Sequence, residues 1–240
     1  MIPQSLPKRR ESDTVGDGFI EEERVAAYIE SLNAGNKGFL AELEKRAKQD
    51  RIPIIRPQVQ NLLKTIITGL KPGKILEVGT AVGFSAILMA QSSPSDCRIT
   101  TIENYEKRIP LARENFKASG YSDRITLIEG DAAKVLKDIK DITYDLVFMD
   151  AAKGQYLNFF EDVMRVLRPG GILVSDNVLQ DGDIIQSRFA VRRRDRTIHS
   201  RMREYLYVLT HDERLSTTIL PMGDGVTVSA KRHDCSVLTG

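Results

Sequence analysis

Apolar residues in the first part of the chain recur at helical spacing. Positions i, i+3, i+4 and i+7 are filled by Val59, Leu62, Leu63, Ile66, Ile67 and Leu70, which predicts an amphipathic helix. The Lys-Pro-Gly-Lys segment at 71–74 ends it. Shorter stripes, Val25, Ile29, Leu32 and Phe39, Leu40, Leu43, predict two earlier helices. Because no strand alternates with these three segments, we expect them to cap a sheet formed by the rest of the chain.

After residue 74 the pattern changes to short apolar runs that alternate with helical stretches. The runs lie at 74–79, 98–103, 125–131, 144–150 and 171–177. Helices are predicted from about Ser85, around Leu111, Ala112 and Phe116, at 132–139 and at 156–167, where Arg-Pro-Gly-Gly ends the last one. Apolar runs separated by helices are typical of parallel strands buried on both faces. The chain is therefore predicted to form a doubly wound, mainly parallel α/β sheet.

The C-terminal pattern differs from this alternation. Two strand-like runs, 216–221 and 226–231, flank the turn sequence Met-Gly-Asp-Gly, which predicts an antiparallel hairpin at one edge of the sheet. We expect one domain over residues 21–232, a flexible N-terminal tail at 1–20 and a short C-terminal tail at 233–240.

Composition narrows the class of protein. With 240 residues, 41% of them hydrophobic, the chain is long enough for one substantial core. A formal net charge of +2 identifies no partner. Two cysteines without a CxxC pair argue against a disulfide framework or a structural zinc site. The sequence lacks a run of about 18 apolar residues and an apolar signal segment, so we expect a cytoplasmic protein without membrane contact.

Acidic or amide side chains follow most of the predicted parallel strands. Glu103, Asp131, Asp150 and the Asp176–Asn177 pair stand at strand ends, and glycines follow the first strand. In open α/β sheets the ligand lies beyond the carboxyl ends of the strands. A ring of acids at this edge indicates a ligand with hydroxyls and positive charge, or a cation.

The loop after the first strand favours a nucleoside without a pyrophosphate. Its glycines, Gly79 and Gly83, are spaced GxxxG instead of GxGxxG, and the Lys-Ser/Thr of a P-loop is missing. Glu103 stands where an acid holds the two ribose hydroxyls of a nucleotide. S-adenosylmethionine fits, with Asp131 accepting from the adenine amino group. Alternatively, the two glycines serve only a tight turn, and Glu103 is a solvated side chain that binds no ligand.

Asp150, Asp176 and Asn177 bring three oxygen donors to two neighbouring strand ends. Such sets suit hard cations, Mg²⁺ first, with Mn²⁺ or Ca²⁺ possible. Alternatively, the Asp-Asn pair caps a turn. Lys153 follows Asp150 by three residues. An ammonium beside a cation and a sulfonium would give up its proton readily, which suits a general base; the alternative is an ion pair with Asp150.

Together these motifs resemble the cation-dependent O-methyltransferases of the catechol and caffeoyl-CoA type. The resemblance covers roughly residues 35–232 and rests on ILEVGTAVGFSAI, TIE, GDA, FMDAAKGQY, ILVSDNVL and LPMGDGVTVS, in that order. DAAKGQY and the arginine-rich stretch near residue 192 are most similar to the bacterial tRNA 5-hydroxyuridine methyltransferases. The family implies a Rossmann-like class I methyltransferase with a seven-stranded sheet, usually a homodimer.

The resemblance also implies roles for single residues. Asp150, Asp176 and Asn177 match the metal ligands, and Lys153 matches the proposed catalytic lysine. The positions that match the cofactor site are Ile55, Glu77, Gly79, Gly83, Ser85, Glu103, Asp131, Ala132 and Asp150. Ser85 would meet the methionine end near Gly79, and Ile55 lies where a segment closes over the cofactor. The chain has no tryptophan and no aromatic-rich insertion, which argues against a phenylpropanoid substrate.

Residues 187–204 form a strongly basic stretch after the predicted metal ligands. Its seven arginines are accompanied by only two acids, Asp195 and Glu204. Arginine side chains bind phosphate oxygens bidentately, so we expect Arg192, Arg193 and Arg194 to hold tRNA phosphates near the anticodon. Alternatively, the stretch is a solvated helix face or a set of ion pairs across a dimer.

The expected function is Mg²⁺-dependent methyl transfer from S-adenosylmethionine to the 5-hydroxyl of 5-hydroxyuridine at the wobble position of tRNA, giving 5-methoxyuridine. A second possibility keeps the site and changes the substrate to a small catechol-like or other vicinal-oxygen metabolite. A non-enzymatic nucleotide-binding module, in which the acids are structural, is the third.

Overall fold

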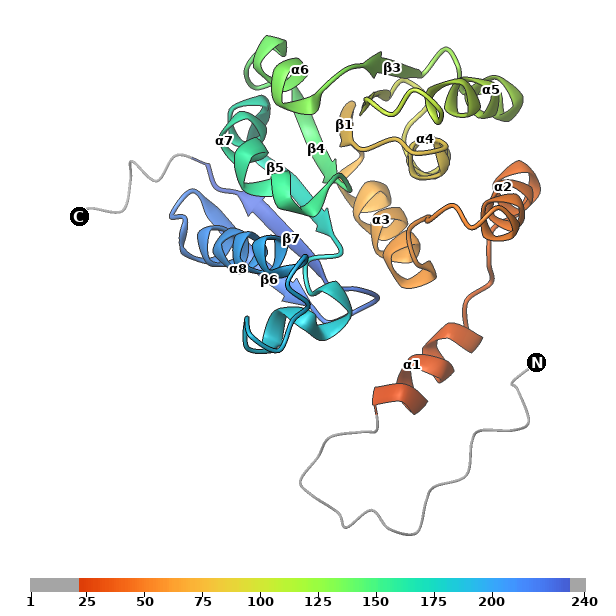
Figure 1. Cartoon of the computed structure of the whole chain (residues 1–240). Helices are drawn as coiled ribbons and strands as arrows, with labels where there is room; N and C mark the ends of the chain where they lie inside the picture. Colours follow the sequence, from red (N-terminus) through yellow and green to blue (C-terminus); the bar gives the residue numbers. More distant parts are fainter. Residues whose placement is uncertain (1–21, 234–240) are drawn as a thin grey trace.

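The computed structural model describes residues 22–233 and is built around one seven-stranded sheet (Figure 1). The strands are β1 (Lys74–Val78), β2 (Arg98–Glu103), β3 (Ile125–Glu129), β4 (Tyr144–Met149), β5 (Leu167–Asp176), β6 (Leu215–Leu220) and β7 (Val226–Lys231). Their order is β3-β2-β1-β4-β5-β7-β6. The first five strands pair in parallel, and β7 is antiparallel to both β5 and β6. The predicted mainly parallel sheet with a C-terminal antiparallel hairpin is confirmed.

Strand order reverses between β1 and β4, and this reversal places the ligand-binding edge. The chain moves outward from β1 through β2 to β3 and then returns to the other side of β1. Just past the strand ends, the Gly79 amide donates to the Ile102 carbonyl at 3.0 Å, and the Asp150 amide donates to the Val78 carbonyl at 2.9 Å. The carboxyl ends of β1, β2 and β4 therefore lie together, where ligands bind in such sheets.

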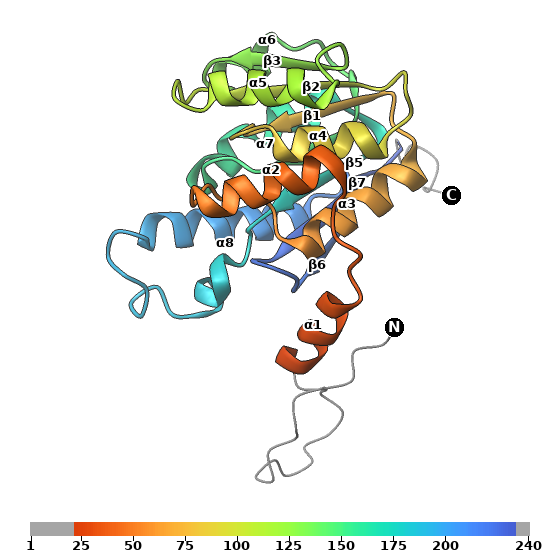
Figure 2. The same cartoon turned by 90° about the vertical axis from the view of Figure 1, so that its right-hand side faces the viewer.

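Helices cover both faces of the sheet (Figures 1 and 2). One face packs against α2 (Gly38–Gln49), α3 (Pro57–Leu70), α4 (Phe84–Ser92) and α5 (Ile109–Ser119). The other packs against α6 (Ala132–Asp138), α7 (Tyr156–Val166) and α8 (Arg196–His211). Ile75 and Leu76 enter opposite core clusters, because successive side chains of a strand point to opposite faces.

The predicted capping by the early helices holds for α2 and α3, whereas α1 (Glu22–Ser31) stands away from both layers (Figure 2). The side chains of Ile29 and Leu32 are 53% and 58% exposed. Ile29 in α1 and Leu32 just after it are thus not buried against this sheet.

Two elements differ from the sequence-based boundaries. Arg-Pro-Gly-Gly does not follow the end of the helix as a stop signal: α7 ends at Val166, and the segment lies inside β5. Pairing of Leu167 with Tyr144, followed by a register shift, extends the strand through it. Helix α8 is anticipated only by the alternative of a solvated helix face, because its arginines mask a buried stripe of Met202, Tyr205 and Leu209.

The backbone at the end of β1 leaves no room for a side chain at Gly79. Its φ is +102°, and a Cβ there would overlap the carbonyl oxygen of Asp150. Gly120 ends α5 with a φ of +78°, but no atom lies within 4 Å of the position that a Cβ would take. The two glycines thus share unusual backbone geometry and differ in the space around them.

We expect Gly79→Ala to lower the free energy of unfolding by at least about 2 kcal/mol more than Gly120→Ala. Both substitutions strain the backbone, but only the one at Gly79 also causes steric overlap. Urea unfolding of both variants measures the difference. Equal destabilisation would show that the contact between β1 and β4 relaxes freely.

Candidate active site

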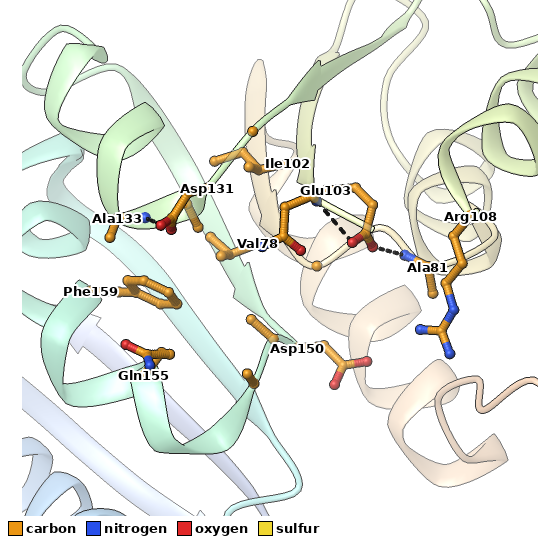
Figure 3. A pocket seen from close by; sticks show the side chains of 16 residues that line it. Val78, Ala81, Ile102, Glu103, Arg108, Asp131, Ala133, Asp150, Gln155 and Phe159 are labelled. Carbon is orange, nitrogen blue, oxygen red and sulfur yellow. Dashed lines mark hydrogen bonds between the residues drawn. The ribbon is translucent and has the colours of Figure 1, made fainter. Parts of the chain in front are cut away.

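A cavity of about 570 Å³ opens at the carboxyl ends of β1, β2 and β4 (Figure 3). Five residues predicted for the cofactor line it: Gly79, Glu103, Asp131, Ala132 and Asp150. Gln155 and Phe159 complete the wall from the segment after β4. They were not predicted, because nothing in their local sequence shows that the start of α7 folds back over the strand ends. The structure therefore gathers acids and an aromatic ring around one space.

Glu103 is held in place by backbone amides. Its carboxylate accepts hydrogen bonds from Ala81 at 2.8 Å, Asn104 at 3.0 Å and Tyr105 at 2.9 Å. The contact to Ala81 is visible in Figure 3. A carboxylate has about four acceptor sites, so capacity remains for hydroxyl groups in the cavity. The Gly-rich loop after β1 thus orients the acid that ends β2.

Two further parts of the predicted cofactor site adjoin this space. Asp131 caps α6 by accepting from the Ala133 amide at 2.9 Å, which holds its carboxylate at the cavity wall. A smaller cavity is lined by Ile55 and Ser85 and shares Gly79 and Asp150 with the larger one. The structure therefore brings the predicted adenine, ribose and methionine residues into one continuous arrangement.

Two of the three predicted metal ligands, Asp150 and Asn177, contact the ammonium of Lys153. Its Nζ donates to Asp150 Oδ1 at 3.0 Å and to Asn177 Oδ1 at 2.6 Å. Asp176 accepts a hydrogen bond from the backbone amide of Asn177 at 2.7 Å. Burial, reinforced by the charge of Asp150, raises the pKa of Asp176 to about 7.

These contacts show that one carboxylate oxygen and one amide oxygen converge on a cation, and oxygen donors of these types suit a hard divalent ion. Within residues 22–233, no cluster of three His, Cys, Asp or Glu side chains has metal-binding geometry; this set consists of two carboxylates and one amide.

Tyr156 joins the two strands that carry these ligands. It is fully buried, and its hydroxyl lies 3.0 Å from the Met149 carbonyl and 3.1 Å from the Asp176 carbonyl. It also accepts from Lys153 Nζ at 3.2 Å. This role is not predicted from the sequence, where the available signal is a tyrosine directly after the Lys-Gly-Gln segment, at the start of a helix. The hydroxyl fixes the ends of β4 and β5 relative to each other.

Comparison with known proteins identifies the family. A sequence profile for O-methyltransferases matches residues 30–232. The chain belongs to this O-methyltransferase family. The caffeoyl-CoA O-methyltransferase of Stellaria longipes is 28% identical over 88% of this chain and 91% of the relative. The catechol O-methyltransferase of Mycobacterium tuberculosis is 29% identical over 67% and 74%.

A solved structure supports the same assignment. A Podospora anserina methyltransferase bound to S-adenosylhomocysteine superposes with a TM-score of 0.80 and 28% identity, covering 91% of this chain and all of that one. The protein is thus an S-adenosylmethionine-dependent O-methyltransferase of the catechol and caffeoyl-CoA type. The finer resemblance to tRNA 5-hydroxyuridine methyltransferases has no counterpart among these relatives.

Two residues predicted for the cofactor lie outside both cavities of this O-methyltransferase. Glu77 is fully buried and accepts from the Ser85 hydroxyl and, at 2.5 Å, from the Thr101 hydroxyl. Gly83 begins α4 with a φ of +84°, and a Cβ there would lie 2.5 Å from the ring of Phe116. Glu77 thus holds the Ser85 side chain by a hydrogen bond. Close packing against Phe116 explains why residue 83 is a glycine.

The basic stretch is only partly free for a ligand. Arg196, Arg201 and Arg203 donate to backbone carbonyls, for example Arg201 to Gly154 at 2.9 Å. Arg192, Arg193 and Arg194 are exposed in the turn before α8, and among the described residues they line neither cavity. Contact with tRNA and homodimer formation stay predictions. No helix in the described part of the chain is long and apolar enough to cross a membrane.

Burial raises the pKa of Glu77 to about 8, although its two hydroxyl partners favour the ionised form. Between pH 4.5 and pH 8 the Glu77 carboxyl group is therefore ionised in the unfolded chain and protonated in the folded protein. The contribution of this proton to the free energy of unfolding is complete below this range and is lost as the pH rises through it.

We expect Glu77→Gln, which does not titrate, to unfold with a smaller loss of stability between about pH 5 and pH 8 than wild type. The difference should be on the order of a few kcal/mol. Urea unfolding at the two pH values measures it. Parallel pH profiles for the two proteins would mean that Glu77 ionises normally in the fold.

Proposed function

We propose that this O-methyltransferase methylates one hydroxyl of a small metabolite that carries a second oxygen on the adjacent carbon, as a catechol does. The supporting observation is the convergence of Asp150 and Asn177 oxygens on Lys153 at the edge of the cavity, with the buried Asp176 carboxyl group close enough to feel both charges. These residues would hold a divalent cation, Mg²⁺ first, with Mn²⁺ or Ca²⁺ as alternatives. The names of the catechol and caffeoyl-CoA relatives support the same substrate class.

The bound groups bring the reactive chemistry, and the chain orients them. S-adenosylmethionine supplies an electrophilic methyl group, and a cation would acidify and orient the acceptor hydroxyl. Glu103 accepts from the ribose hydroxyls and Asp131 from the adenine amino group. Ser85 and Ile55 hold the methionine end. The aromatic ring of Phe159 covers one side of the cavity and excludes water there.

Lys153 takes the proton of the acceptor hydroxyl in this proposal. Its Nζ contacts oxygens of Asp150 and Asn177, and the Tyr156 hydroxyl at 3.2 Å keeps it between the two strand ends. To act as a general base, the lysine must be in its amine form when it accepts this proton. The proton acceptor thus stands next to the position where the acceptor oxygen would be fixed.

The second candidate substrate is 5-hydroxyuridine at the wobble position of tRNA. Its hydroxyl and neighbouring carbonyl oxygen form the same kind of pair. Exposure of Arg192, Arg193 and Arg194, beside the 82% exposed Phe189, favours it, since single-stranded nucleic acids bind to basic surfaces that carry aromatic side chains.

Labelled S-adenosylmethionine with Mg²⁺ and either a catechol or hydroxyuridine-bearing tRNA distinguishes the two substrates. We expect methylated catechol, loss of the product in EDTA and recovery with added Mg²⁺. Full activity in excess EDTA would contradict the cation site. Methylation of tRNA alone, weakened by replacing the three exposed arginines with alanine, would establish the second candidate instead.

We expect Lys153→Met to lower kcat at least about 100-fold, because the proton acceptor is removed. Binding of S-adenosylhomocysteine, measured by calorimetry, should stay within about twofold of wild type, since Lys153 lines neither cavity. Lys134→Met, on the exposed side of α6, is the matched control. Unchanged kcat in Lys153→Met would leave Lys153 as a charge partner of Asp150.

A further inference from the structure

The side-chain amide of Asn177 must be turned in one direction to serve a cation. Its oxygen can bind a cation, and its NH₂ group cannot. In the structure Oδ1 faces Lys153 Nζ at 2.6 Å, and Nδ2 donates to Asp224 Oδ2 at 2.9 Å. An ammonium only donates and a carboxylate only accepts, so both neighbours select the same orientation of the amide.

The two neighbours do not remain equivalent when a cation binds. A cation held by the oxygens of Asp150 and Asn177 would compete with Lys153 for the Asn177 Oδ1 atom. Asp224 contacts the opposite end of the amide, so its hydrogen bond would be compatible with a bound cation. Asp224 is therefore the contact that still orients Asn177 in the loaded site.

The β6–β7 turn holds Asp224 against the segment that follows Asn177. The Val178 amide donates to the Gly225 carbonyl at 3.0 Å, and the Leu179 amide donates to the Asp224 carbonyl at 2.8 Å. Gly225 packs so closely on Leu179 that a Cβ would overlap that side chain. The backbone of Asp224 is thus fixed relative to Asn177, although 47 positions separate the two residues.

An ion pair with Arg56 fixes the other end of the Asp224 carboxylate. The Asp224 side chain is 17% exposed, so water screens this pair less than a surface pair. Arg56 directly follows Ile55, which lines the smaller cavity together with Ser85. The chain Arg56–Asp224–Asn177 thus connects the segment over the predicted methionine end to the predicted cation site.

We propose that Asp224 is a positioning residue that turns the Asn177 oxygen toward the cation, and that Arg56 holds Asp224 in place. The inference rests on the proposed cation site and adds to it a residue from the C-terminal hairpin. Partners that orient a metal ligand contribute typically about 10- to 100-fold to metal affinity or activity.

The test measures Mn²⁺ affinity by electron paramagnetic resonance, with no turnover. Asp224→Asn can offer Asn177 either an oxygen or an NH₂ group, so the amide loses its fixed orientation. We expect Mn²⁺ to bind at least about tenfold more weakly. Affinity for S-adenosylhomocysteine, measured by calorimetry without metal, should stay near wild type. Asp145→Asn is the matched control, because Asp145 also pairs with an arginine, Arg168, but stands at the start of β4.

Two double variants separate orientation from charge. Arg56→Gln with Asp224→Asn restores the net charge but leaves the amide unoriented, so binding should stay weak. Asn177→Asp with Asp224→Asn reverses donor and acceptor and presents an oxygen whichever way residue 177 turns, so binding should recover. Recovery in the first variant, or none in the second, would overturn the proposal.

Mn²⁺ binding by the wild-type protein shows whether the cation site or the role of Asp224 is wrong. If wild type binds no Mn²⁺, the cation site itself is wrong, and the positioning role is overturned with it. If wild type binds Mn²⁺ and Asp224→Asn binds it equally well, only the role of Asp224 is overturned.

Discussion

Repulsion between two carboxylates at neighbouring strand ends is the constraint on which the rest of the site depends. Asp150 follows β4 and Asp176 ends β5, and the raised pKa of Asp176 reflects burial first and the charge of Asp150 second. Buried like charges are costly unless a cation compensates them. Lys153 supplies one from the segment after β4, and Tyr156 fixes its nitrogen and both strand ends. The pairing of β4 with β5 thus brings two carboxyl groups close together, and their charges stabilise a cation between the strand ends.

The strand order connects this place to the cofactor cavity. Reversal between β1 and β4 opens the sheet edge where the Gly79 loop and the Asp150 segment meet. Asp150 consequently belongs to both regions: it lines the cavity and contacts Lys153. A methyl donor in the cavity and an acceptor at the cation site would thus face each other across one carboxylate. Proximity of this kind would follow from the strand order of the sheet.

The sequence was sufficient for features governed by local pattern. The run at 98–103 coincides with β2, and the strand-end acids gather because parallel strands share one carboxyl edge. It was insufficient where distant pairing decides. The β5 boundary depends on Tyr144, and the apolar stripe of α8 is hidden among arginines. Phe159 and Asp224 gain their positions from contacts with residues far away in the chain, which no spacing rule reports.

The proposed cation site by itself would not distinguish a small catechol from a nucleoside, because both present two adjacent oxygens. Selectivity must come from surfaces beyond the oxygens. The segment between β5 and α8 places Ile185 and Phe189 in solvent, 81% and 82% exposed, beside unburied arginines. Both side chains are thus accessible to a substrate that extends over this segment. This segment follows Asn177 directly in the chain, so a substrate large enough to reach it would be selected there, whereas a small substrate would be selected by the cavity walls alone.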